Sequence, residues 1–255
     1  MFRPRIIPVL LLKLNGIVKS VQFKNHRYIG DPINAVKIFN DLRADELVFL
    51  DIIAGKENRV ISTDLVKSIG EEANMPFSVG GGIRSLLEIG SLLRAGAEKV
   101  ILNSVAIQHP IFVKEAAESF GSSTIVVCID VKKNLFGKQI VSSENGTKNS
   151  GLVPKDFAQE MEYYGAGEII VQSVDRDGTM LGYDLDLISN VSKSVSIPVV
   201  ALGGAGSLDH LKQAFENSYA TGVAAGSLFV YHGSRKGILI NYPDRLTINK
   251  LFNQT

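Results

Sequence analysis

The sequence lacks the features that mark several large classes of protein. It has one cysteine, Cys128, which excludes a disulfide framework and fits a reducing compartment. Its formal net charge is +1 and its basic residues are scattered, so no nucleic acid partner is indicated. The apolar run before Lys13 is only seven residues long, too short for a signal peptide or a membrane span. We therefore expect a cytoplasmic protein that does not contact a membrane.

Other absences concern cofactors and domain boundaries. The four histidines, His26, His109, His210 and His232, show no metal-ligand spacing, and no glycine fingerprint for a dinucleotide follows the first strand. We therefore expect no metal and no cofactor. Linkers and low-complexity segments are also missing, which predicts a single domain over residues 1–255.

What the sequence does contain is a repeat of about half its length. Phe77–Ser85 reads as an apolar strand, a glycine loop and a serine that begins a helix, and Val199–Ser207 reads the same way. The matching pairs Asp51 and Asp175, Ser85 and Ser207, and Ser104 and Ser227 are each separated by about 123 residues. The repeat predicts two related half-units, residues 1–122 and 123–255.

Each half-unit carries a potential phosphate cradle. Glycines allow close approach of a ligand to the backbone, and free N–H groups at a helix start attract an anion. The predicted cradle residues are Gly81, Gly82, Asn103 and Ser104 in the first half, and Gly203, Gly204, Gly226 and Ser227 in the second. Two cradles indicate a ligand with a phosphate group at each end.

The order of apolar runs predicts an α/β fold. A buried strand over Ile6–Leu12 is followed by a helix that begins at Asp31-Pro32. Further strands begin near Glu46, Pro76, Glu98, Ser123, Glu168, Pro198 and Thr221, and further helices near Thr63, Ser85, Pro110, Lys155, Asp184 and Ser207. Eight strands that alternate with helices favour a closed (β/α)8 TIM barrel, with an open doubly wound sheet as the alternative. A polar, lysine-containing loop follows the first strand, the stretch 132–151 interrupts the rhythm after the fifth strand, and the tail after His232 is not a good helix.

Ligand-binding residues of such a barrel lie at the carboxyl ends of its strands. Besides the cradle residues, the sequence places Lys19, Asp51, Asp130, Asp177 and Gly178 there. Asp130 ends an apolar strand and is a candidate general acid or base, or else a cap of the next loop. Asp175–Gly178 is either a binding loop or a plain turn. Cys128 lacks a histidine partner and is favoured as a core residue over a nucleophile.

Four charged residues stand at the opposite ends of the strands. Arg5, Glu46, Lys99 and Glu168 each begin or immediately precede an apolar run. Two positive and two negative side chains can close one end of a barrel with ion pairs, and stability of that end is the simplest interpretation.

The motifs together resemble the cyclase subunit of imidazole glycerol phosphate synthase. The resemblance runs from Arg5 to Phe229 and rests on the runs 45–52, 80–84, 127–130, 175–179 and 203–207. It implies that a glutaminase subunit docks at the barrel bottom, with Glu98 at the interface. It also implies that ammonia passes a gate formed by Arg5, Glu46, Lys99 and Glu168 and reaches a bis-phosphorylated substrate at the other end.

One departure from the family pattern bears on catalysis. The family uses two aspartates, and Asp130 matches one of them, whereas Leu11 occupies the position of the other. Loss of half of an acid–base pair typically costs ~10²–10⁴-fold in rate. In addition, Gln172 replaces a threonine, and Leu202 replaces a small polar residue.

This combination is similar to paralogues from bacterial surface-polysaccharide pathways. There, a barrel delivers ammonia to a separate ATP-dependent amidotransferase that makes an acetamidino sugar. The runs 10–13, 143–147 and 229–233 resemble that branch. The main hypothesis is therefore an ammonia-conducting subunit with impaired cyclase chemistry. The alternatives are a working cyclase of histidine biosynthesis and a non-catalytic protein-binding scaffold.

Overall fold

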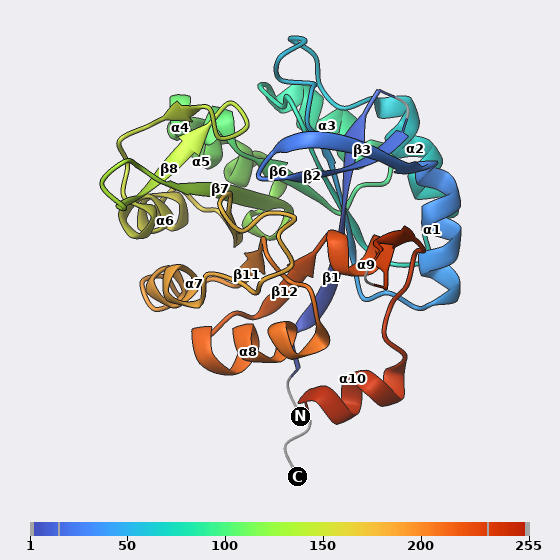
Figure 1. Cartoon of the computed structure of the whole chain (residues 1–255). Helices are drawn as coiled ribbons and strands as arrows, with labels where there is room; N and C mark the ends of the chain where they lie inside the picture. The colour runs from blue at the N-terminus through green and yellow to red at the C-terminus, as the bar shows by residue number, and fades with distance from the viewer. Residues whose placement is uncertain (1–2, 15, 234, 253–255) are drawn as a thin grey trace.

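A computed structural model of the chain describes residues 3–14, 16–233 and 235–252. Eight parallel strands close into a barrel, because each pairs with the next and β12 pairs with β1 (Figure 1). The barrel strands are β1 (Arg5–Lys13), β4 (Leu47–Asp51), β5 (Phe77–Gly80), β6 (Lys99–Leu102), β7 (Ile125–Lys133), β10 (Glu168–Ser173), β11 (Val199–Leu202) and β12 (Gly222–Ala225). The predicted TIM barrel is confirmed, and each half of the sequence supplies four of its strands.

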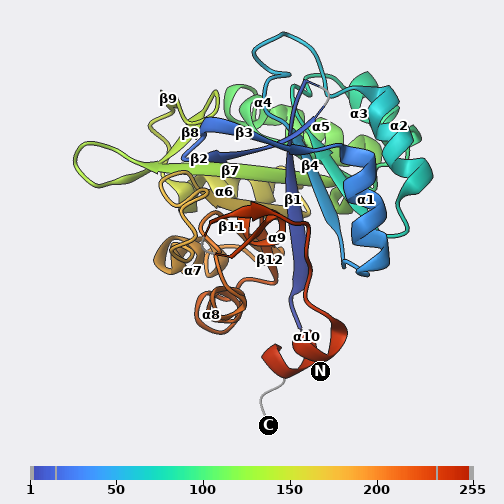
Figure 2. The ribbon, with the colours of Figure 1, turned by 45° about the vertical axis from the view of Figure 1, so that its right-hand side comes forward.

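Helices cover the outside of the barrel (Figure 2). They are α1 (Pro32–Asp41), α2 (Thr63–Glu72), α3 (Leu86–Arg94), α4 (Ser104–Gln108), α5 (Ile111–Phe120), α6 (Pro154–Tyr163), α7 (Leu185–Ser192) and α8 (Leu208–Ser218), with a short 3₁₀ turn over Ser122–Thr124 after α5. The side chains of Ser62, Ser85, Asp184 and Ser207 accept hydrogen bonds from the first turns of α2, α3, α7 and α8. These polar residues therefore fix where the helices begin, as the sequence predicts.

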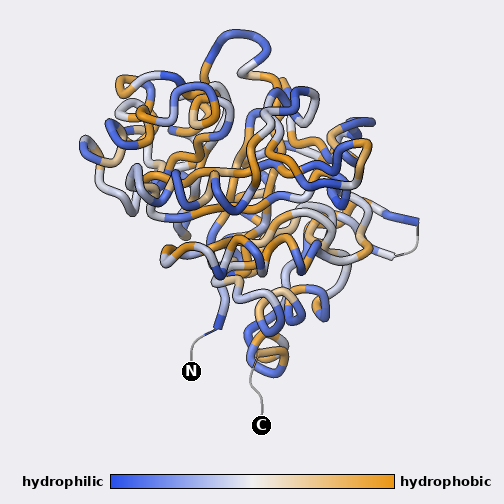
Figure 3. The backbone as a smooth tube through the Cα atoms, turned by 90° about the vertical axis from the view of Figure 1, so that its left-hand side faces the viewer, coloured by the Kyte–Doolittle hydropathy of each residue, from blue (hydrophilic) through white to orange (hydrophobic). Residues whose placement is uncertain are grey.

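Alternation along each strand divides the apolar residues into two cores. On β1, Ile7, Val9 and Leu11 face the barrel interior, whereas Ile6, Leu10 and Leu12 belong to the layer between strands and helices. Figure 3 shows this as hydrophobic segments gathered in the central strands, with hydrophilic turns around them. Every second residue of a barrel strand therefore points its side chain into the barrel interior.

Two of the irregular stretches form hairpins at the carboxyl ends of the strands. The strands β2 (Gly16–Val21) and β3 (Lys24–Gly30) extend β1 as an antiparallel hairpin, where the sequence indicated only a polar loop. The second is made of the end of β7 with β8 (Gln139–Ser143) and β9 (Lys148–Asn149). Both hairpins lie beside the barrel mouth and are absent from the simple strand–helix rhythm.

The chain after β12 is displaced from the pattern of the preceding units. A single-turn helix, α9 (Ser227–Val230), is followed by the small pair β13 (Tyr231–His232) and β14 (Gly237–Ile238), and then by α10 (Arg245–Phe252). The segment 238–243 is not helical, as expected, and α10 lies near the start of β1 in Figures 1 and 2. Within the described ranges, no helix has the length and apolarity that crossing a membrane requires.

Tyr242 fastens this C-terminal segment to the barrel. Its hydroxyl donates a hydrogen bond to the carbonyl of Ile6 at 3.0 Å and accepts one from the amide of Asp45 at 3.2 Å. Asp45 in turn pairs with Arg3 through both of its oxygens, at 2.6 and 2.7 Å. One buried phenol therefore joins the last segment to the first strand.

We predict that Tyr242→Phe lowers the free energy of unfolding by about 1–3 kcal/mol, because the carbonyl of Ile6 and the amide of Asp45 lose a buried partner. Urea unfolding of purified protein measures this. Tyr163→Phe serves as the control, since Tyr163 is 84% exposed. Equal midpoints for the two variants would show that the Tyr242 hydroxyl contributes nothing.

Candidate functional site

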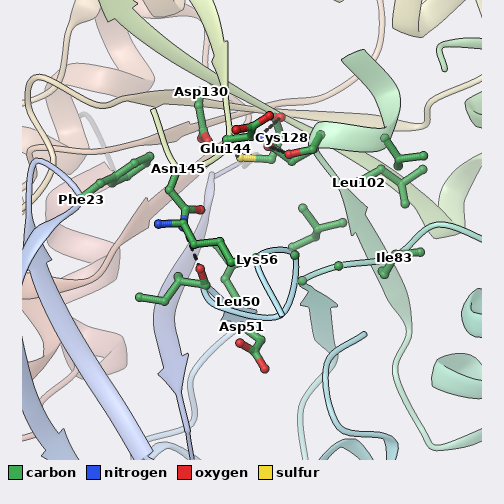
Figure 4. Close-up of a pocket in the computed structure, with 18 of the residues that line it drawn as sticks. Phe23, Leu50, Asp51, Lys56, Ile83, Leu102, Cys128, Asp130, Glu144 and Asn145 are labelled. Carbon is green, nitrogen blue, oxygen red and sulfur yellow. Dashed lines mark hydrogen bonds between the residues drawn. The ribbon is translucent and has the colours of Figure 1, made fainter. Parts of the chain in front are cut away.

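A cavity of about 620 Å³ opens at the carboxyl ends of the strands (Figure 4). Several strands and both hairpin regions contribute to its wall, including Phe23 from the β2–β3 turn and Asn145 from the β8–β9 turn. Asn145 donates a hydrogen bond to the carbonyl of Ile52 at 2.8 Å, so the β8–β9 turn is tied to the loop after β4. The cavity is therefore formed by the barrel mouth and partly covered by its loops.

Asp130 lines this cavity from within β7, which continues to Lys133, so Asp130 does not end its strand as the sequence indicated. It is 7% exposed, and the Cys128 thiol donates a weak hydrogen bond to its Oδ1 at 3.7 Å. Burial raises the pKa of Asp130 to about 7. The side chains of Cys128 and Asn103 favour the charged form and lower the pKa, but burial outweighs them. Burial also raises the pKa of the Cys128 thiol well above its usual range. Asp130 is thus poised to exchange a proton near neutral pH, whereas Cys128 is a poor nucleophile.

Leu11 lines the same cavity but adds no proton-transfer group. It is 8% exposed and packs in the interior cluster with Val9 and Val18. β1 and β7 are separated by four places around the eight-stranded ring, so Leu11 and Asp130 are on opposite walls. At these two opposed positions the cavity has one carboxyl, that of Asp130, where an acid–base pair needs two groups.

The first predicted cradle belongs to the cavity. Gly81, Gly82, Asn103 and Ser104 line it. Gly82 has φ +70°, and a Cβ there would lie 1.9 Å from the carbonyl oxygen of Arg59, so the loop requires glycine. Asp51 also lines the cavity, but its carboxylate accepts hydrogen bonds from the amides of Ile53 and Ala54 and pairs with Arg59 at 2.5 Å. The role of Asp51 in this structure is to order the loop after β4.

The second predicted cradle does not contribute to this cavity's wall, which contains none of Gly203, Gly204, Gly226 and Ser227. Lys19 covers Gly226, since a Cβ on that glycine would lie 1.9 Å from the lysine Nζ. The buried ammonium of Lys19 donates to the carbonyl of Val9 at 2.6 Å, and burial lowers its pKa to about 8.

Asp177 and Gly178, also predicted to bind substrate, hold the β2–β3 hairpin in place. Asp177 accepts a hydrogen bond from the Ser20 hydroxyl at 2.9 Å and one from the amide of Phe23 at 3.4 Å. Gly178 has φ +69°, and a Cβ there would lie 2.2 Å from the Ser20 carbonyl oxygen. The neighbouring Asp175 accepts from the amide of Lys133 at 2.9 Å. Their ligand-binding roles remain predictions.

Several cavity residues could not be located from the sequence. Lys56, Arg84 and His109 bring positively charged or polar side chains to the rim near the first cradle. They come from loops and helix ends whose path depends on tertiary contacts, such as the hydrogen bond from Arg84 to the carbonyl of Gly55 at 2.8 Å. The one signal in the sequence that points to such residues is a basic residue that follows a predicted glycine loop.

At the other end of the barrel, the four predicted charged residues form a closed ring of alternating sign. Arg5 pairs with Glu46 at 2.5 Å and also with Glu168, and Lys99 pairs with Glu168 at 2.8 Å and with Glu46 at 3.7 Å. Burial lowers the pKa of Arg5, but Glu168 and Glu46 outweigh this and raise it above its ordinary value. Ser78 adds a hydrogen bond to Glu46 at 2.9 Å. Each carboxylate is almost fully buried and is compensated by two cations.

One other predicted residue can be located. Glu98, expected at a partner interface, is exposed beside Lys99 at this end of the barrel, and its interface role remains a prediction. In the part of the chain that the structure describes, no cluster of three or more His, Cys, Asp or Glu side chains could hold a metal ion.

Comparison with known proteins agrees with this architecture. The family described as "Histidine biosynthesis protein" matches residues 5–236, which is most of the chain. The chain belongs to this family. A family member from Leptospira borgpetersenii, provisionally named imidazole glycerol phosphate synthase subunit HisF, is 47% identical over 99% of this chain and 100% of its own length.

Two further members of the histidine biosynthesis family span nearly the same length. A Pseudomonas aeruginosa protein, provisionally named imidazole glycerol phosphate synthase subunit hisF2, is 44% identical over 98% of this chain and 99% of its own. The imidazole glycerol phosphate synthase subunit HisF of Streptococcus mutans is 42% identical over 91% of this chain and 92% of its own. The resemblance deduced from the motifs is confirmed at the level of the family.

We predict that Gly82→Ala destabilises the protein by about 2 kcal/mol or more, because alanine is strained at positive φ and its methyl group would collide with the Arg59 backbone. Gly30→Ala is the matched control, since a Cβ at Gly30 meets no atom within 4 Å. Chemical unfolding of both variants measures the difference. Similar losses for both would mean that the loop after β5 adapts to a side chain.

We predict that Asp130→Asn stabilises the protein more at pH 8 than at pH 4.5. The pKa of Asp130 is about 7 in the fold against 3.8 for an exposed aspartate, so the folded state keeps this proton longer than the unfolded state. The contribution of Asp130 to stability therefore falls as the pH rises between these values. At about 1.36 kcal/mol per pKa unit, the gain from asparagine grows by roughly 2–4 kcal/mol across this range.

Urea unfolding at both pH values measures this gain. Asp156→Asn is the control for replacing a carboxyl by an amide, because Asp156 is exposed on α6. A gain for Asp130→Asn that does not change with pH would show that Asp130 ionises in the fold as it does in the unfolded chain.

Proposed function

We propose that the chain is the barrel subunit of a glutamine-dependent amidotransferase complex. In this function a glutaminase subunit docks at the end with the charged ring and releases ammonia there. Ammonia then passes through the barrel interior and leaves at the cavity beside Asp130. The observation that carries the proposal is the combination of an intact charged ring with Leu11 on the wall opposite Asp130.

The interior supports passage of a small neutral molecule. Between the ring and the cavity, the inward side chains of β7, β10 and β11 include Val126, Ile170 and Val200, all of which are buried and apolar. β12 contributes only Gly222 and Ala224 to the corresponding levels. An apolar interior favours ammonia over ammonium, because burying an unpaired charge is costly. Among the described residues, the charged ring is the polar barrier on this route, and it lies at the N-terminal ends of the strands.

The absence of a carboxyl at position 11, opposite Asp130, supports delivery over cyclisation. Proton transfer by a positioned side chain requires a group that gains or loses a proton, and the leucine side chain has none. Asp130 alone can act either as the proton donor or as the proton acceptor of such a reaction, but it cannot act as both at once. We therefore propose that the cyclase reaction of the family is impaired in this chain.

We further propose that the ammonia is used to make an acetamidino sugar for a surface polysaccharide, through a separate ATP-dependent amidotransferase. The motifs at 10–13, 143–147 and 229–233 support this branch. The match to a relative whose name denotes a second copy, hisF2, agrees with a role beside the histidine pathway.

A working cyclase is the second candidate. Asp130, with a pKa of about 7, lies in one cavity with the glycine loop at Gly82, which is the pairing of acid–base group and phosphate cradle that a cyclase needs. The identity to the Streptococcus mutans subunit also favours it. The scaffold hypothesis is weaker, because a protein-binding surface does not need a charged ring that faces the barrel interior.

We predict that the purified barrel shows no cyclase turnover with saturating ammonium and the bis-phosphorylated cyclase substrate, and that Leu11→Asp either restores weak turnover or leaves it undetectable. Product formation in a stopped assay measures this. Any rescued activity should disappear in Leu11→Asp/Asp130→Asn, because the pair would again lack one carboxyl.

Appreciable turnover of the wild-type chain would contradict the delivery function and return the protein to histidine biosynthesis. The delivery function itself is then tested by adding a purified glutaminase subunit of the family and measuring complex formation. A barrel that does not bind any such subunit would overturn it.

A further inference from the structure

Gln172 is a largely buried polar residue whose carboxamide is open to the cavity. It is 5% exposed, and its carboxamide has no hydrogen-bond partner among the described residues, yet it is not among the fully enclosed side-chain groups that lack a partner. It lines the cavity and faces the interior, since Glu168 and Ile170 on the same strand also point inward. Because the carboxamide reaches the cavity, its donor and acceptor groups are available to a ligand or to water there.

The residues beside Gln172 divide the inner end of the cavity into a polar and an apolar side. Asn103 directly follows β6, Asp130 lies within β7, and Gln172 is the last residue but one of β10. These three strands are neighbours in the barrel, and Gln172 is directly paired with Asp130 in register. The opposite side includes Leu11 and Leu50. A small polar molecule at this level therefore has hydrogen-bonding groups on one side only.

This polar arc is also the first that a molecule meets on leaving the interior. On β10, Glu168 belongs to the charged ring, Ile170 follows in the interior, and Gln172 comes next. At about 3.3 Å per residue, the ring and Gln172 are separated by roughly 13 Å along the strand. On the neighbouring β7, the described residue between these levels that offers a hydrogen bond is Cys128, through its weakly donating thiol.

We propose that Gln172 and Asp130 form an exit site that binds ammonia at the end of the interior and holds it as ammonium. This inference rests on the proposed function, because that function brings ammonia to this level. The Gln172 amide can donate to the lone pair of ammonia and can accept from its N–H groups. Protonated Asp130 then gives its proton to the ammonia nitrogen, which leaves a carboxylate paired with ammonium. No other reactant is needed.

The surrounding charges permit this transfer. The charge of Asp177, in the loop after β10, adds to burial in raising the pKa of Asp130. The Lys19 ammonium from β2 is directed to the carbonyl of Val9, and its charge acts on Asp177. Cys128 remains a thiol. A single cation can therefore be accommodated beside Asp130 without a second negative group in direct contact.

Nuclear magnetic resonance of the free barrel tests the site without any glutaminase. The side-chain amide of Gln172, assigned by its absence in Gln172→Leu, is followed during titration with ammonium chloride and with tetramethylammonium chloride at equal ionic strength. We expect a saturable shift with ammonium alone and binding at least about tenfold weaker in Asp130→Asn, since a charge-assisted contact is lost. A shift that does not saturate, or is equal with tetramethylammonium, overturns the exit site.

Retention of ammonia in the complex provides the second test. The complex is given glutamine labelled with ¹⁵N in its side-chain amide, in the presence of excess unlabelled ammonium, and the reaction is quenched rapidly. The measured quantity is the amount of ¹⁵N label that stays with the protein for each glutamine consumed. We expect at least fivefold less retained label for Gln172→Leu than for Gln213→Leu, an exposed control on α8. Equal retention overturns the exit site. If glutaminase fails to bind the barrel while the ammonium titration still saturates, the proposed function fails and the binding site stands.

Discussion

Burial of four charges inside one end of a barrel is tolerable only if they compensate one another. Glu46 and Glu168 are each almost fully buried, and each contacts both Arg5 and Lys99. A missing member would leave the ring with one uncompensated buried charge, and breaking a buried ion pair typically costs about 3–5 kcal/mol. The four positions on β1, β6, β10 and the residue before β4 must therefore be kept in register together. That register sets which residues of the same strands face inward, and so brings Leu11, Asp130 and Gln172 to one level at the opposite end.

Much of the fold could be predicted because its signals are local. The apolar runs indicate where the strands lie, and capping residues such as Ser85 indicate where the helices begin. Glu88 completes a capping box with Ser85. The inward position of Asp130 followed from counting along its strand. The β2–β3 hairpin could not be predicted in the same way, because β3 is largely polar and exposed. Its position also depends on contacts with Asp177, about 150 residues later in the chain. For the same reason, the sequence alone did not reveal that Asp51 and Asp177 are occupied by structural hydrogen bonds.

The two halves are alike in sequence pattern but differ at the mouth. Both glycine loops have the positive φ angles that a close approach to the backbone requires, at Gly82 and at Gly204. In the first half this loop lines the open cavity. In the second, Lys19 lies over Gly226, and Gly204 contacts the carbonyl of Gly182 so closely that a Cβ would lie 2.2 Å from it. A repeat at the level of strands and helices thus leaves the two cradles unequally accessible, because Lys19 of the β2–β3 hairpin lies over the second cradle.

Closure of the barrel has a consequence for how the chain must fold. The residues of β1 pair with β12 from Arg5 opposite Gly222 to Pro8 opposite Ala225, so the seam joins segments more than 200 residues apart. Contacts of such long sequence separation form slowly, since the loop between them must be closed first. During synthesis, β1 therefore has one edge without a strand partner until nearly the whole chain has been made, and such edges promote association between chains. Late arrival of β12, and of the Tyr242 contact that follows it, makes completion of the seam the step at which this edge is removed.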